Sequence, residues 1–150
     1  MGQLTFMMGK HEAHFPADRQ YARNHMWALA GPASTRFGLT AYAVRLLLDV
    51  YFLEWSVAAG SRVALRQPIG SIESKKAESE LYAPADGYLS RFNEQLLDDP
   101  SLINADGYGE GWLLEMQTDD SSFMSPQQYL RHLEAVWKVA QQTIKGQSHA

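Results

Sequence analysis

Short apolar runs separated by polar turns give the middle of the chain its clearest pattern. Residues 69–72 and 81–83 are largely apolar, and the segment between them is polar and carries Lys75 and Lys76. Two apolar runs around a short polar segment are typical of a β-hairpin. The tip is too polar to bury, so both lysines are expected in solvent. From composition alone, the plainest interpretation is a charged tip that keeps the sheet edge soluble.

The same reasoning predicts strands before and after this hairpin. Residues 21–30 are expected to begin as a turn and become a short strand, which pairs with residues 36–39 as a second predicted hairpin around the turn residues 31–34. Residues 50–55 are predicted to form a strand because they are rich in β-branched and aromatic residues. Residues 112–116, which follow a glycine-rich loop, are predicted to form the final strand. Residues 94–103 are expected to hold one or two helical turns, interrupted near Asp99-Pro100. Many short strands with Gly turns predict a mainly β sandwich or flattened barrel with helical flanks.

Two helices are predicted with defined starts. Thr40 is a plausible N-cap for a short helix over residues 41–48. A C-terminal helix over residues 125–145 has Ser125 as cap, Pro126 at its first position and Gln128 completing a capping box. Its apolar residues recur at three- and four-residue steps, which predicts one face packed on the β core, and Gly146 is expected to end it. Residues 1–20 look polar and aperiodic and are expected to be a flexible extension before a single domain over residues 21–150.

Composition and charge argue against several classes of function. The chain has 150 residues, a formal net charge of −4 and no cysteine. There is no basic stripe for nucleic acid, no run of transmembrane length and no secretory signal pattern. Without cysteine there is no disulfide, thiolate nucleophile or cysteine metal site, which suits a cytoplasmic protein.

Catalytic motifs are not evident, so a non-enzyme is expected. Gly107, Gly109 and Gly111 resemble a phosphate loop, but a strand follows them instead of a helix. His11 and His14 share a predicted flexible segment with too few ligands for a metal, and His25 reads as a core or rim residue. We expect no metal site.

A series of short motifs, in order, resembles the H-protein of the glycine cleavage system, a lipoyl carrier. The similarity runs from about Tyr21 to Met116. Each motif is weak by itself, and the specificity lies in their order and spacing. The motifs are Tyr21-x-x-x-His25-x-Trp27, Phe37-Gly38-Leu39-Thr40-x-Tyr42-Ala43, Val50-Tyr51-Phe52-Leu53-Glu54, Ile72-Glu73-Ser74-Lys75-Lys76-Ala77, Tyr82-Ala83-Pro84 with Gly87, Asn93-Glu94-x-Leu96, Pro100-x-Leu102-Ile103-Asn104 and Tyr108-Gly109-Glu110-Gly111-Trp112-Leu113.

The resemblance implies a lipoyl/biotinyl-type barrel-sandwich hybrid with lipoate joined covalently to one lysine. The family's modified lysine immediately precedes alanine, which selects Lys76 over Lys75. Glu73, Ser74, Ala77 and Glu80 would be the flanking recognition residues. Biotin carriers share the architecture but usually place methionines around the lysine, and this tip is unlike theirs.

The implied partners are a PLP-dependent glycine decarboxylase, a folate-dependent aminomethyltransferase, a dihydrolipoyl dehydrogenase and a lipoate ligase or lipoyltransferase. Lipoate would carry the chemistry and the protein would supply position. In this reading the chain shuttles the aminomethyl group of glycine on the lipoyl-lysine arm.

Several positions depart from the family pattern. Met26 and Leu46 stand where the family commonly has a carboxylate and a histidine that hold the loaded amine. Leu48 replaces a usual glycine, and Gly107 replaces a proline. These departures keep two alternatives open: an H-like lipoate-binding carrier for another pathway, such as sulfur oxidation or lipoyl relay, and an unmodified binding module.

Overall fold

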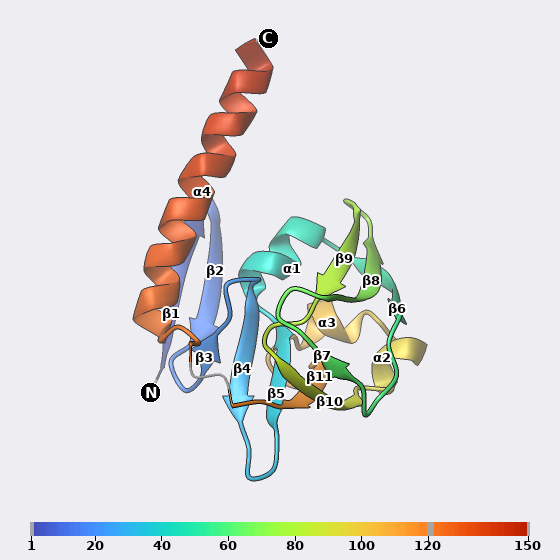
Figure 1. Cartoon of the computed structure of the whole chain (residues 1–150). Helices are drawn as coiled ribbons and strands as arrows, with labels where there is room; N and C mark the ends of the chain where they lie inside the picture. Colours follow the sequence, from blue (N-terminus) through green and yellow to red (C-terminus); the bar gives the residue numbers. More distant parts are fainter. Residues whose placement is uncertain (1, 120–121, 150) are drawn as a thin grey trace.

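The computed structural model describes residues 2–119 and 122–149, with side chains described through residue 141 (Figure 1). It is mainly β, with three sheets and four helices in this part of the chain. The strands and helices, in chain order, are β1 Gln3–Met8, β2 His11–Pro16, β3 Gln20–Tyr21, β4 Met26–Ala30, β5 Thr35–Leu39, α1 Ala41–Leu47, β6 Val50–Trp55, β7 Arg62–Val63, β8 Pro68–Ser74, β9 Glu78–Tyr82, β10 Gly87–Phe92, α2 Gln95–Asp98, α3 Leu102–Ala105, β11 Leu114–Gln117 and α4 Pro126–His149.

Two sheets enclose the main core. The larger sheet has the order β3-β4-β5-β11-β10-β7, and the smaller has the order β6-β8-β9. One apolar cluster takes side chains from both sheets, including Phe37 of β5, Leu53 of β6, Ile72 of β8 and Leu89 of β10. Apolar residues that alternate along strands place one face of each sheet against the other. The predicted flattened β-sandwich is confirmed, and it sets β8 and β9 as a hairpin at one end of the molecule.

The local start signals act as predicted. Met26–Ala30 pairs with Thr35–Leu39 in antiparallel register. The Thr40 hydroxyl accepts the backbone N–H of Ala43 at 3.4 Å at the start of α1. At α4, the Gln128 amide oxygen accepts the Ser125 N–H at 2.8 Å, and the Ser125 hydroxyl accepts the Gln128 N–H at 3.2 Å. This reciprocal pair is the predicted capping box.

One helical prediction is confirmed and another is wrong. The interruption near Pro100 is confirmed, since α2 ends at Asp98 and α3 begins at Leu102. The predicted helix end at Gly146 is wrong, because α4 runs to His149. One glycine in a long helix costs only about 1 kcal/mol relative to alanine, which is too little to force an end.

The prediction of a flexible N-terminal extension is also wrong. β1 and β2 form an antiparallel hairpin with the register Gln3↔Pro16 to Met8↔His11. Phe6, Met8, Ala13 and Phe15 are buried in a second cluster that includes Tyr129 and Leu133 of α4. In Figure 1 this hairpin runs beside the lower half of α4. The apolar side chains of the hairpin that face inward pack against one face of α4. Burial of these side chains stabilises the hairpin in its folded form.

Aromatic rings fix this second cluster. The Tyr21 and Tyr129 rings stack with centroids 4.6 Å apart, and Phe15 meets Tyr129 edge-on at 5.3 Å. Such pairs stabilise beyond the area they bury. The cluster therefore joins β2 and α4 to β3 at the edge of the larger sheet.

No helix within residues 2–119 and 122–149 combines the length and the apolar character needed to cross a lipid bilayer.

Candidate functional site

The lysine pair stands at the end of the β8–β9 hairpin. The two strands pair from Pro68↔Tyr82 through Glu73↔Glu78, which leaves residues 75–77 as the connecting tip. Lys75, Lys76 and Ala77 are exposed there. The hairpin and its solvated lysines were both predicted from the sequence. The pairing fixes the direction in which the tip leaves the sheet.

Ser74 holds the tip from inside. Its side chain is only 5% exposed. The hydroxyl donates to the Ala77 carbonyl oxygen at 3.0 Å, and it accepts from the N–H groups of Ala77 at 3.1 Å and Lys76 at 3.3 Å. A serine hydroxyl that bonds nearby backbone groups in this way closes a tight turn. Ser74 is therefore a structural residue of the tip, because these bonds require a hydroxyl at this position.

The tip is also held from outside by the end of α1 and the residues that follow it. The Lys75 N–H donates to the Asp49 carbonyl oxygen at 2.8 Å, and the Lys76 N–H donates to the Leu47 carbonyl oxygen at 3.3 Å. Asn104 of α3 supports this segment, because its amide donates to the Leu48 carbonyl at 2.7 Å and accepts the Val50 N–H at 2.9 Å. The backbone of the two lysines is thus held by Ser74 of β8 and by the residues at the end of α1, while the lysine side chains are exposed.

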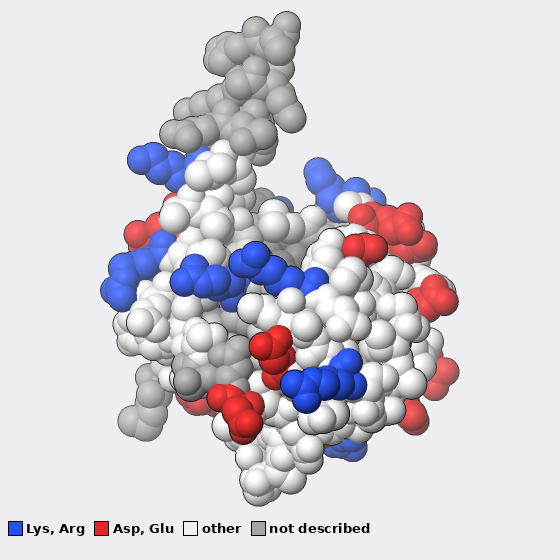
Figure 2. All heavy atoms as spheres, in the orientation of Figure 1, with Lys and Arg blue, Asp and Glu red and all other residues white. Residues whose placement is uncertain are grey.

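Acidic side chains flank the tip. Glu73 lies opposite Glu78 across the hairpin, and Glu80 follows on β9, where it accepts the Tyr82 hydroxyl at 2.9 Å. Figure 2 shows blue and red atoms side by side in the upper right of the molecule, where Figure 1 draws this hairpin. The structure brings Glu73, Ser74 and Ala77 to the tip, while Glu80 lies further along β9.

A small hollow lies beside the tip. Its volume is about 350 Å³, and it is lined by Val44, Arg45, Leu48, Asp49, Lys75 and Asn104. That volume is at the lower end of the range for small-molecule sites, roughly 300–1,000 Å³. Arg45 was not singled out from the sequence, since nothing in its local pattern shows that α1 and the hairpin tip meet in space.

The comparisons with known proteins agree with this geometry. The sequence model described as "Glycine cleavage H-protein" matches residues 19–142. The glycine cleavage system H protein of Rubrobacter xylanophilus is 42% identical over 124 residues, covering 81% of this chain and 97% of the relative. The chain belongs to the glycine cleavage H-protein family.

Other members and a solved structure give the same result. A probable glycine cleavage system H protein of Natronomonas pharaonis is 41% identical over 110 residues, covering 73% of this chain and 86% of the relative. The crystal structure of a glycine cleavage system H protein from Mycobacterium marinum superposes with a TM-score of 0.69 at 31% identity, covering 81% of this chain and 98% of that one. The fold that the sequence motifs predicted is therefore confirmed by its similarity to a solved H-protein structure.

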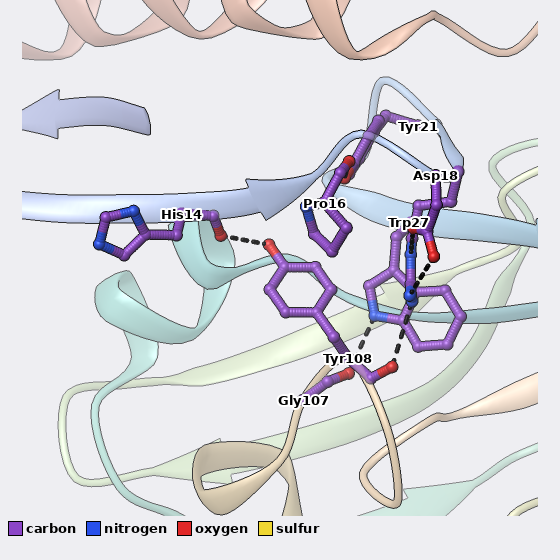
Figure 3. A network of polar contacts seen from close by, with 8 residues as sticks. His14, Pro16, Asp18, Tyr21, Trp27, Gly107 and Tyr108 are labelled. Atoms are coloured by element: carbon purple, nitrogen blue, oxygen red, sulfur yellow. Dashed lines mark hydrogen bonds and ion pairs between the residues drawn. The ribbon is translucent and has the colours of Figure 1, made fainter. Parts of the chain in front are cut away.

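The N-terminal hairpin lies before the region that matches the H-protein family. The match begins at residue 19, whereas β1 and β2 span residues 3–16. The hairpin is nevertheless bound to the H-protein fold through Tyr108, whose hydroxyl donates to the His14 carbonyl at 2.9 Å and accepts the Ala41 N–H at 2.8 Å. Figure 3 shows Tyr108 reaching to β2.

The glycine-rich loop has a structural role in this H-protein. The Gly107 carbonyl accepts the Trp27 indole N–H at 2.9 Å, and the Tyr108 carbonyl accepts from Arg19 at 3.1 Å (Figure 3). After the loop the chain enters β11, not a helix, as the sequence predicted. The sequence interpretation of these glycines as turn residues agrees with this arrangement.

The two departures at Met26 and Leu46 have different surroundings. Met26 is 1% exposed and belongs to the main core, whereas Leu46 is 46% exposed on α1. Met26 packs between the sheets, so its side chain offers no surface to an arm at the tip. Leu46 remains an exposed apolar side chain on the helix that precedes the tip.

His25 is a half-buried structural histidine. Its Nδ1 lies 2.9 Å from the Tyr129 hydroxyl, which in turn lies 2.8 Å from the Thr40 hydroxyl. Burial, with a smaller contribution from His132, lowers the pKa of His25 to about 4. A histidine held neutral in this way connects α4 with the start of α1. It matches the sequence interpretation of a satisfied core or rim residue.

Proposed function

We propose that this chain is the lipoyl-bearing carrier of a glycine cleavage system and that Lys76 is the attachment point. The observation that carries the proposal is the tip itself: in a member of this family, an exposed lysine precedes alanine on a hairpin whose backbone is held by Ser74 and by Asp49. The residues fit a covalently attached group, because the Lys76 side chain is exposed while its backbone is anchored.

The proposed carrier role assigns separate tasks to the cofactor and the protein. When bound as an amide to Lys76, lipoate would supply the disulfide that accepts the aminomethyl group of glycine and the dithiol that is later reoxidised. The hairpin would present the arm at a fixed place, so that motion is confined to the side chain and the arm. Glu73, Ser74, Ala77 and Glu80 would be the residues that the attaching enzyme recognises.

The partners follow from that chemistry. A PLP-dependent glycine decarboxylase would load the arm, a folate-dependent aminomethyltransferase would unload it, and a dihydrolipoyl dehydrogenase would reoxidise it. A lipoate ligase or lipoyltransferase would modify Lys76, and all of these would act in the cytoplasm. The protein itself would be a carrier without a catalytic site.

A second candidate is a carrier of the same build that serves another pathway. Leu46 favours it, because an exposed apolar side chain on α1 offers a cationic amine no hydrogen-bond acceptor. Glycine–bicarbonate exchange with the decarboxylase separates the two candidates. The lipoylated protein should support exchange and the unmodified protein should not. If the lipoylated protein supports no exchange, the glycine cleavage assignment is wrong and the second candidate takes its place.

A further inference from the structure

Asn104 of α3 bridges the two sides of Asp49. Its amide N–H donates to the Leu48 carbonyl oxygen at 2.7 Å, and its amide oxygen accepts the Val50 N–H at 2.9 Å. To make both bonds, one short side chain must donate and accept at the same time, which asparagine can do and an ionised aspartate cannot. The two bonds therefore explain an amide at residue 104.

The bond from Asn104 to Val50 sets the direction of the carbonyl that holds Lys75. A peptide unit is planar, so a bond to its N–H also fixes the carbonyl on its other side. The Val50 N–H belongs to the same unit as the Asp49 carbonyl, which accepts the Lys75 N–H at 2.8 Å. Asn104 thus acts on the backbone of the tip through one rigid unit.

The carbonyl that holds Lys76 lies two peptide units earlier in the chain. It belongs to Leu47 and accepts the Lys76 N–H at 3.3 Å. The N–H of the same unit is that of Leu48, which donates to the Val44 carbonyl at 2.9 Å. Asn104 holds the unit between the two anchors through the Leu48 carbonyl. The relative direction of the two anchors therefore depends on the backbone angles at Leu48.

Leu48 has backbone angles that side chains avoid. Its φ is 61° and its ψ is −144°, a combination that glycine adopts readily. A strained conformation of this kind persists only where the surroundings hold it. Asn104 holds the Leu48 carbonyl, and Val44 accepts the Leu48 N–H. Without the Asn104 amide, Leu48 should relax towards ordinary angles, which would turn the two anchoring carbonyls away from the lysines.

We propose that Asn104 is a positioning residue for lipoyl attachment: it holds Leu48 in its strained conformation, so that the tip presents Lys76 in one place to the attaching enzyme. Asn104 itself is fixed by the helix that carries it, because the neighbouring Ile103 is 1% exposed in the main core. The inference rests on the proposed function, since it requires attachment at Lys76.

The rate of lipoylation tests the proposal. The full chain is incubated with lipoate, ATP and a lipoate ligase, and intact mass gives the initial rate at several protein concentrations. Asn104→Ala should lower kcat/KM roughly tenfold, because a misplaced reacting group costs up to about a hundredfold per ångström. Gln95→Ala truncates an exposed amide on the preceding helix α2 and should keep the wild-type rate. Urea unfolding shows that each variant is folded under the assay conditions.

Glycine at residue 48 distinguishes positioning from a general loss of structure. Glycine needs no support at these angles, so Asn104→Ala made in the Leu48→Gly background should change kcat/KM by no more than about twofold. A fall as large as in the wild-type background would overturn the inference. Asn104→Asp keeps the acceptor for Val50 and loses the donor to Leu48. It should behave as Asn104→Ala does, and it replaces that variant in both backgrounds if the alanine variant does not fold.

The same assay separates this inference from the proposed function. Wild-type protein that is lipoylated at Lys76, together with Asn104 variants that are lipoylated at the wild-type rate, would overturn the role of Asn104 alone. A fall in Gln95→Ala equal to that in Asn104→Ala would overturn it as well. Wild-type protein that gains no lipoyl group would overturn the proposed function, and this inference with it.

Discussion

The backbone N–H of Lys75 donates to the carbonyl oxygen of Asp49 at 2.8 Å. This bond connects the tip of the β8–β9 hairpin to the segment after α1, two parts of the chain that are 26 residues apart (75 minus 49). Because Lys76 is bound to the same segment through the Leu47 carbonyl, the tip is a fixed platform rather than a loose loop. A carrier needs this, since a flexible backbone would spread the position of the arm.

Replacing Ser74 by alanine should loosen that platform. The hydroxyl makes three hydrogen bonds to the tip backbone in a nearly buried setting. Their loss should lower the free energy of unfolding by about 1–2 kcal/mol, measured by urea denaturation. Ser79→Ala is the matched control, because Ser79 is exposed on the same hairpin and makes one long bond to Glu80. Equal effects of the two substitutions would contradict the role given to Ser74.

Leu48 occupies a backbone conformation that suits glycine. Its φ is 61°, in the region where a side chain is strained, and it ends α1 next to the tip. Relief of such strain is worth on the order of 1–3 kcal/mol. Because Leu48 is half-buried, the test compares two variants that both lose the side chain. Leu48→Gly should be more stable than Leu48→Ala by about 1–2 kcal/mol in thermal or urea unfolding. A glycine variant that is less stable than the alanine variant would argue against strain.

The N-terminal hairpin should contribute measurably to stability. Phe15 is 1% exposed and packs edge-on against both Tyr21 and Tyr129. Phe15→Ala should cost about 3–5 kcal/mol, the usual range for a buried phenylalanine. Met7→Ala on the same hairpin should cost little, since Met7 is 48% exposed. If Phe15→Ala also costs little, the hairpin is not docked on α4 in solution.

The half-buried His25 predicts a loss of stability in acid. Its pKa is about 4 in the folded protein, against an ordinary value of 6.5. Between these values the unfolded chain binds a proton that the folded chain does not, so the free energy of unfolding should fall as the pH falls from about 6.5 to about 4. The full effect of one such group is about 3 kcal/mol. Urea unfolding across this range measures it.

His25→Asn is the control for the acid effect. Asparagine tolerates the positive φ of 66° at this position and retains a polar side chain near Tyr129. The variant should be less stable at neutral pH but should show a flatter dependence between pH 6.5 and 4. A pH dependence as steep as that of the wild type would assign the effect to other groups.

Much of the site could be predicted from the sequence because its signals are local. The polar tip between apolar strands, the Thr40 cap and the capping box at Ser125 each depend on a few neighbouring residues. The N-terminal hairpin also had a local signal that was missed. Leu4, Phe6 and Met8 alternate before Gly9, and Ala13 and Phe15 alternate after it, but the exposed Met7 obscures the pattern.

Other features could not be predicted because they arise from contacts between distant segments. Arg45 becomes part of the hollow only because α1 meets the hairpin tip, and its position depends on His11. Met26 stands where the family commonly has a carboxylate, but the pairing of β4 with β5 places its side chain in the core. Neither fact follows from the residues next to these positions.

The central claim is that Lys76 carries the lipoyl group, and intact mass spectrometry tests it most directly. The wild-type protein, Lys75→Arg and Lys76→Arg are each incubated with lipoate, ATP and a lipoate ligase. Arginine keeps the charge at each position while removing the amine that forms the amide. A gain of one lipoyl group is expected in the wild-type protein and in Lys75→Arg, and none in Lys76→Arg. A gain retained in Lys76→Arg, or no gain in the wild-type protein, would contradict that claim.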